Sequence, residues 1–133
     1  MKYKHYKQHR NTNACAPSEH DEQTVFMTWL MFQYPTLFEL TTAVPNGGRR
    51  HLGTAVKLKK EGVKAGVPDI LCFYKKNGYT GLAIEMKSKY NKESKEQAKW
   101  LNNLSDQGWF CAVCWSAKDA MQAVEDYLKG GIE

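Results

Sequence analysis

Two apolar runs joined by an Asn77-Gly78 pair constrain the fold of this chain more than any other feature. Residues 69–75 and 81–87 both have the composition of strands, and an Asn-Gly pair between two such runs is typical of a tight antiparallel hairpin. A helical pattern over 94–104 and a strand pattern over 109–115 follow. The strands at 81–87 and 109–115 are therefore expected to be parallel, with a right-handed crossover. This order predicts an α/β domain with a mixed central sheet flanked by helices.

The rest of the chain completes this outline. The patterns predict a helix that is capped by Ser18 and stops before Pro35, a strand over 37–44, a short helix over 54–60 that ends at Gly62, and a last helix from Ser116 to Gly130. Residues 1–17 are polar and basic and end in Ala-Pro, so we expect a flexible arm there. We expect residues 18–130 to form a single domain.

Positive charge is concentrated in the middle of the chain. The 133 residues carry a net charge of +5, but residues 46–99 alone sum to +8. Such a distribution favours a polyanionic partner. The chain has no apolar run of the roughly 20 residues that span a membrane and no apolar stretch after its basic N-terminus. We therefore expect a cytoplasmic protein, in the cytoplasm of the host cell if a phage encodes it, with no membrane partner.

Two of the four cysteines form a C-x-x-C pair, Cys111 and Cys114. Such a pair occurs in zinc and redox sites. Here it lies in a strand pattern, where residues three apart point to opposite faces, and neither a second pair nor a His pair follows it. Reduced structural thiols are therefore the favoured interpretation.

The candidate site comes from the predicted hairpin. Asp69 begins one strand and Glu85 lies near the end of the next, so both carboxylates are expected at one edge of the sheet. Lys87 follows two residues later and faces the same side as Glu85. Two carboxylates, with the backbone carbonyl of Met86 as a possible further ligand, suit Mg²⁺ or Mn²⁺. Such a cation activates water and offsets negative charge on a phosphodiester, and Lys87 would orient that water or stabilise the transition state.

Simpler interpretations compete with this one. An E-x-K sequence in isolation is most often an exposed strand face with a cross-strand salt bridge. That interpretation does not explain why an apolar strand becomes ionic at its end, beside an Asp that follows a proline. Paired carboxylates also occur in retaining glycosidases, but Lys87 and the basic surroundings suit phosphate better than sugar.

Pro68-Asp69 followed by Glu85-Met86-Lys87 resembles the PD-(D/E)xK nuclease signature. Further segments narrow the resemblance to a stand-alone VRR-NUC domain of the kind common in phages and prophages: they are Asn46–Arg49, Leu58–Asp69 and Ser94-x-x-Gln97-x-x-Trp100-Leu101. The resemblance covers about residues 18–129. It implies a restriction-endonuclease-like core and Mg²⁺- or Mn²⁺-dependent hydrolysis of DNA, without an organic cofactor. Small members resemble Holliday-junction resolvases, which implies a homodimer acting on branched DNA.

The resemblance also assigns roles. Asp69 and Glu85 become metal ligands, Lys87 the catalytic lysine, and Gln97 a residue that buttresses the site. The family places a Glu on its first helix, and Glu19, with Gln23 four residues later, fits that position. Glu22 is a close competitor, and helix-dipole stabilisation is an equally good explanation for either acid. Gln97 has a simpler role open to it as a capping or solvated residue.

Five basic residues before the Asp69 strand are candidate contacts to DNA phosphates: Arg49, Arg50, Lys57, Lys60 and Lys64. The helical lysines among them equally suit a solvated helix face. The four tryptophans lie on apolar stripes, so we expect them in the core or at a dimer interface. Two other functions remain open: a nucleic-acid-binding module with the same fold that does not cut, and an interaction protein whose basic middle binds another protein.

Overall fold

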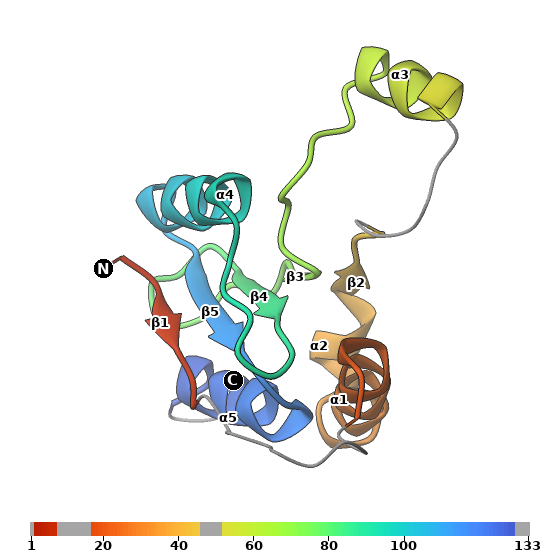
Figure 1. The fold of residues 1–133 in the computed structure, drawn as a ribbon. Helices are drawn as coiled ribbons and strands as arrows, with labels where there is room; N and C mark the ends of the chain where they lie inside the picture. Colours follow the sequence, from red (N-terminus) through yellow and green to blue (C-terminus); the bar gives the residue numbers. More distant parts are fainter. Residues whose placement is uncertain (1, 8–16, 46–51, 130–133) are drawn as a thin grey trace.

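A mixed five-stranded sheet forms the centre of the molecule in the computed structural model, which describes residues 2–7, 17–45 and 52–129 (Figure 1). The strands are β1 (Lys4–His5), β2 (Thr41–Ala43), β3 (Ile70–Cys72), β4 (Leu82–Met86) and β5 (Phe110–Cys114), in the spatial order β1-β5-β4-β3-β2. The helices are α1 (Glu19–Gln33), α2 (Pro35–Glu39), α3 (Leu52–Lys60), α4 (Lys95–Asp106) and α5 (Ala117–Tyr127). β5 is parallel to β1 and β4, whereas β3 is antiparallel to β2 and β4. The predicted α/β class and mixed sheet are confirmed.

The predicted hairpin is present. Asn77 and Gly78 have φ angles of 52° and 83°, the left-handed conformations that a type I′ turn requires. The strands they join pair with Ile70 opposite Ile84. Both strands are shorter than the sequence pattern suggested, because regular pairing of β3 ends at Cys72.

Helices cover the sheet on both faces and divide its side chains into two groups. One group packs with α1 and α5 and includes Ile84 and Met86 of β4, together with Phe26 and Tyr127. The second group lies on the other face, where Ala83 packs with Leu101 of α4. Even-numbered residues of β4 therefore face α1, and odd-numbered residues face α4. Glu85 belongs to the face that α4 covers.

Two buried cysteines and two tryptophans, one buried and one partly buried, complete the two groups. Cys111 packs on the α4 face and Cys114 on the α1 and α5 face, as the strand pattern predicted, and both are free thiols. Burial raises the pKa of both thiols. Trp109 and Trp115 pack on the α4 face, in agreement with their predicted core position.

The strand predicted over 37–44 is wrong in its first half. Pro35 stands at the first turn of α2, where its fixed φ and missing N–H suit a helix start. Leu37 lies in this short helix and is 1% exposed. Extended chain begins only at Thr41, whose hydroxyl donates to the carbonyl of Leu37 at 2.6 Å.

The arm expected over residues 1–17 is partly ordered. Lys4 and His5 form an edge strand beside β5, and the backbone N–H of Tyr6 donates to the carbonyl of Val113 at 2.9 Å. Tyr3 is buried at 8% exposure. Edge pairing and burial of an aromatic side chain explain why a basic segment joins the sheet.

Helix α3 lies apart from the sheet and the other helices (Figure 1). Helix α3 ends at Lys60, and Gly62 follows with a φ of 101°, a left-handed conformation that terminates helices. Among the described residues, no helix combines the length and the apolar composition needed to cross a membrane.

Candidate active site

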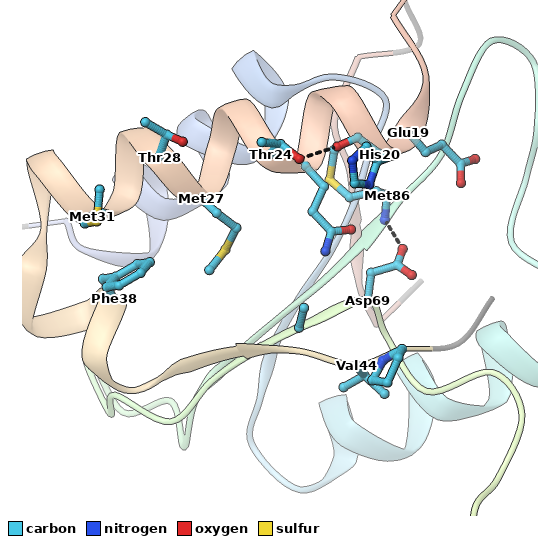
Figure 2. A pocket seen from close by; sticks show the side chains of 13 residues that line it. Glu19, His20, Thr24, Met27, Thr28, Met31, Phe38, Val44, Asp69 and Met86 are labelled. Atoms are coloured by element: carbon cyan, nitrogen blue, oxygen red, sulfur yellow. Dashed lines mark hydrogen bonds between the residues drawn. The ribbon is translucent and has the colours of Figure 1, made fainter. Parts of the chain in front are cut away.

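The two signature carboxylates lie opposite each other at the end of the hairpin. The pairing of Ile70 with Ile84, continued by one residue, places Asp69 across from Glu85. Asp69 Oδ2 accepts a hydrogen bond from the Met86 backbone N–H at 2.8 Å (Figure 2). The hairpin therefore brings the two predicted ligands together, and a backbone donor fixes the first of them.

Glu85 is a buried carboxylate with incomplete hydrogen bonding. It is 1% exposed. Its Oε1 accepts a hydrogen bond from Gln97 Nε2 at 3.0 Å and lies 3.7 Å from Lys87 Nζ. Its Oε2 is buried, and no donor among the described residues contacts it. An ionised carboxylate oxygen without a donor is costly when buried, so this atom favours a proton or a cation beside it.

Burial and neighbouring negative charge raise the pKa of Glu85 to about 9. Burial has the largest effect, followed by the negative charge of Asp69, whereas the Lys87 ammonium acts in the opposite direction and Glu19 adds a smaller increase. The ammonium of Lys87 therefore does not offset the effects of burial, Asp69 and Glu19, and the metal-free Glu85 side chain holds a proton at neutral pH. A perturbation of this kind is characteristic of functional sites.

Gln97 serves both of the roles considered for it. Its Oε1 accepts from the Ser94 backbone N–H at 2.8 Å, and its own backbone N–H donates to Ser94 Oγ at 3.2 Å, which forms the capping box of α4. The amide nitrogen of the same side chain donates to Glu85. The start of α4 thus fixes the donor that holds Glu85.

The structure separates the two acids of the first helix. Glu19 Oε1 accepts from the Ser88 backbone N–H at 2.9 Å, directly after Lys87, and its charge acts on Glu85. Glu22 instead accepts from the backbone N–H of Ala117 at the first turn of α5. The position next to the carboxylates is therefore occupied by Glu19, and Glu22 has the structural role of capping another helix.

These residues fit a hard divalent cation. Among the residues that the structure describes, no three His, Cys, Asp or Glu side chains could enclose a metal ion by themselves. Mg²⁺, however, usually takes one or two carboxylates and completes its shell with waters and substrate phosphate oxygens. Asp69 and Glu85, with the orphaned Oε2 of Glu85, match that pattern. The Met86 carbonyl as a ligand stays a prediction.

A cavity of about 720 Å³ opens beside Asp69, and Glu85 is not one of the residues that line it. Glu19 and Asp69 line one end, and Met27, Met31 and Phe38 line the other (Figure 2). The remaining wall comes from polar residues of α1 and from the end of β2. An open groove along α1 thus reaches the site at Asp69, whereas Glu85 contacts Gln97 of α4.

The predicted DNA contacts do not all gather at this groove. Arg49 and Arg50 lie outside the described residues. Lys57 and Lys60 are exposed on α3, which stands apart from the sheet (Figure 1). Lys64 follows α3 and lines a second cavity, of about 390 Å³, against α4.

Basic, acidic and aromatic side chains line this second cavity. Lys64, Lys99 and Trp100 line it together with Glu96. The indole Nε1 of Trp100 donates to the carbonyl of Ala65 at 3.1 Å, which ties the loop before Asp69 to α4. Trp100 therefore supports this loop, at the edge of a partly basic surface.

A group of contacts around residues 88–93 was not apparent from the sequence. Tyr3 Oη donates to Glu93 Oε1 at 2.8 Å, and His5 Nε2 lies 2.9 Å from the same oxygen. The indole of Trp115 donates to the carbonyl of Asn91 at 2.9 Å. These contacts hold the loop that links Lys87 to the start of α4. A two-residue strand has no periodicity, so no sequence signal could have revealed them.

Comparisons with known proteins agree with this geometry. A model of the VRR-NUC domain family matches residues 5–118. A solved structure described as a "VRR_NUC domain protein" has 28% sequence identity and a TM-score of 0.76, with 87% of this chain and 92% of that chain covered. A search of curated proteins finds no match. The matched region begins within β1, in agreement with the ordered N-terminal segment. The fold and the matched region together show that this chain belongs to the VRR-NUC family, a nuclease-like family whose domain implies interaction with DNA.

Proposed function

We propose that this chain is a divalent-cation-dependent endodeoxyribonuclease that hydrolyses phosphodiester bonds at the Asp69–Glu85–Lys87 centre. The observation that carries the proposal is the environment of Glu85. This carboxylate is buried, lies opposite Asp69, contacts Lys87 and Gln97, and retains one oxygen without a donor. Such a group is unfavourable in a purely structural role and suited to holding a cation.

Each residue has a defined task in this proposal. Asp69 and Glu85 would hold Mg²⁺ or Mn²⁺, with Asp69 oriented by the Met86 N–H. When bound, the cation supplies Lewis-acid chemistry, which lowers the pKa of water and offsets charge on the phosphate. Gln97 orients Glu85 through its amide. Lys87 Nζ donates to the attacking water or to the phosphate oxygens as negative charge develops on them.

Basic residues outside the centre would guide the DNA backbone to it. Lys57 and Lys60 on α3 and Lys64 after it are exposed cations, and Arg49 and Arg50 precede them in the sequence. Phosphate contacts of this kind position DNA without reading its sequence. We further propose that the substrate is branched DNA and that a homodimer cuts two strands.

Cleavage of a panel of labelled linear and branched DNAs, in Mg²⁺, in Mn²⁺ and in EDTA, tests the proposal. Cleavage should require the cation, and Asp69→Ala should abolish it while DNA binding persists. Lys87→Ala should stay inactive at saturating Mn²⁺. Undiminished cutting by Asp69→Ala would refute the site, and salt-sensitive binding without cutting under any condition would identify a silent binding module.

The homodimer has its own test. Sedimentation of the purified protein should give the mass of two chains, and a four-way junction should receive paired symmetric cuts. A monomer that makes single, unpaired cuts would contradict this part of the proposal and leave the active-site assignment intact.

A further inference from the structure

Resting on the function proposed above, we propose that the groove along α1 holds an unstacked nucleobase next to the phosphodiester that is cut. The base would occupy the part of the cavity that the carboxylates do not use. The substrate class would then be DNA with an unpaired or extruded nucleotide beside the cleavage point.

The groove reaches the proposed catalytic centre at Asp69 and extends well beyond it along α1. On α1 its lining recurs every fourth residue, at Glu19, Gln23, Met27 and Met31, which is one stripe of a helix. These positions span twelve residues, or about 18 Å along the helix axis. The volume of about 720 Å³ lies within the range of sites that hold small organic molecules. A cation and one phosphate would fill only the end at Asp69.

The far end of the groove has the chemistry that an unstacked base requires. Phe38 supplies an aromatic ring, and Met27 and Met31 supply polarisable thioethers that adapt to flat ligands (Figure 2). Thr24 and Thr28 line the same cavity and add polar character to it. The Thr24 hydroxyl donates to the carbonyl of His20 at 2.9 Å, so its lone pairs remain available as acceptors. Apolar faces with polar groups between them match the flat faces and polar edge of a base.

A base within a duplex cannot reach this groove. It is stacked and paired, and only a nucleotide that has left the stack can place its phosphate at Asp69 and its base along α1. Extrusion costs least where the nucleotide is already unpaired. The groove would therefore favour DNA with a branch, flap or loop at the cut, and would supply a structural reason for structure selectivity.

Two tryptophan substitutions on α1 test whether the groove binds the base. Thr28→Trp adds a large ring at the rim of the cavity, from an exposed helix position, where the folding cost is small. Val25→Trp is the matched control, because Val25 is 55% exposed on the same helix and does not line the cavity. Neither substitution alters the proposed catalytic residues.

The experiment uses branched DNA that contains 2-aminopurine at successive positions beside the branch. Its fluorescence increases when the base leaves the stack. All proteins carry Glu85→Gln to prevent cleavage, and anisotropy of a second label measures affinity. We expect the fluorescence to increase at one position on binding, the increase to be lost in Thr28→Trp, and the increase to persist in Val25→Trp.

Three results would overturn the inference. They are the absence of an increase at every position, an undiminished increase in Thr28→Trp, and conversion of a dimer to a monomer by Thr28→Trp in sedimentation, which would assign the groove to contacts between copies. A separate cleavage assay on the chain with native Glu85 keeps the two proposals apart. Cleavage without a fluorescence increase would refute base binding in the groove and leave the nuclease proposal intact. A fluorescence increase without cleavage would refute the nuclease proposal and leave base binding intact.

Discussion

At the scale of single residues, Gln97 shows why an amide is required at the third position of α4. A glutamate there would also cap the helix, but it would present a negative charge to Glu85 instead of a donor. We predict that Gln97→Glu keeps the free energy of unfolding within about 1 kcal/mol and reduces cleavage on the order of tenfold or more. Gln97→Ala should lower both the free energy of unfolding and the rate of cleavage. Denaturant unfolding and single-turnover cleavage measure the two effects, and full activity in Gln97→Glu would show that the amide is only a cap.

Glu85 should make the metal-free protein less stable as the pH rises. Folding raises the pKa of Glu85 from 4.5 to about 9, so the folded chain binds more protons than the unfolded chain between these values. The free energy of unfolding should therefore fall with rising pH in this window, by up to about 1.4 kcal/mol per pH unit. Glu85→Gln, which cannot ionise, should remove this dependence.

Urea unfolding in EDTA at pH 6 and pH 8 measures this effect. We expect the advantage of Glu85→Gln over the wild-type chain to be larger at pH 8. Added Mg²⁺ should stabilise the wild-type chain more at pH 8 than at pH 6, because a cation competes with the proton on Glu85. Identical pH dependence in the two proteins would contradict the assigned environment of Glu85.

At the scale of elements, β1 should stabilise the loop that follows Lys87. Burial alone would raise the pKa of Glu93, but hydrogen bonds from its backbone amide, Tyr3 and His5 hold this pKa below its ordinary value. We predict that Tyr3→Phe lowers the free energy of unfolding by about 1 kcal/mol and increases hydrogen exchange in residues 88–93. Tyr90→Phe, at an exposed residue of the same loop, is the control. Equal exchange in both variants would show that β1 does not hold the loop.

Helix α3 should contribute to DNA affinity rather than to the chemistry. Removing one lysine that binds a phosphate should lower the salt dependence of DNA binding by about one unit. We predict this change for Lys57→Ala and for Lys60→Ala, with an unchanged cleavage rate for saturated protein. Lys118→Ala, at an exposed residue of α5, is the control. Binding titrations at several salt concentrations provide the measurement, and an unchanged slope in both α3 variants would exclude α3 from the DNA surface.

Local sequence signals account for most of the fold and for the centre of the site. The Asn77-Gly78 turn predicted the hairpin, and the hairpin register places Asp69 opposite Glu85. The N-caps at Ser18 and Ser94 marked their helices correctly. β1 was missed because two residues carry no period, and α2 because burial of Leu37 looks the same in a strand and in a helix. The groove was missed because it forms where α1 meets the hairpin end at Asp69 and Met86, a contact that is not local in sequence.

At the scale of the whole molecule, the charge distribution is consistent with a site that needs a cation. The net charge of +8 over residues 46–99 flanks Asp69 and Glu85 in the sequence, and these two carboxylates would repel DNA on their own. A bound divalent cation would reverse that local sign and add to the positive charge of the lysines of α3 and its loop. DNA binding should therefore weaken as the salt concentration rises, even when no divalent cation is present. Cutting should depend on both the salt concentration and the divalent cation.

The central claim is that Glu85 takes part in hydrolysis of DNA, and single-turnover cleavage of an end-labelled branched DNA tests it most directly. The wild-type chain should cut in Mg²⁺ and stop in EDTA. Glu85→Gln, which retains the shape of the side chain and an acceptor for Gln97, should bind the same DNA and cut it on the order of a thousandfold more slowly. Cutting by Glu85→Gln at the wild-type rate, or cutting by the wild-type chain in EDTA, would contradict the account.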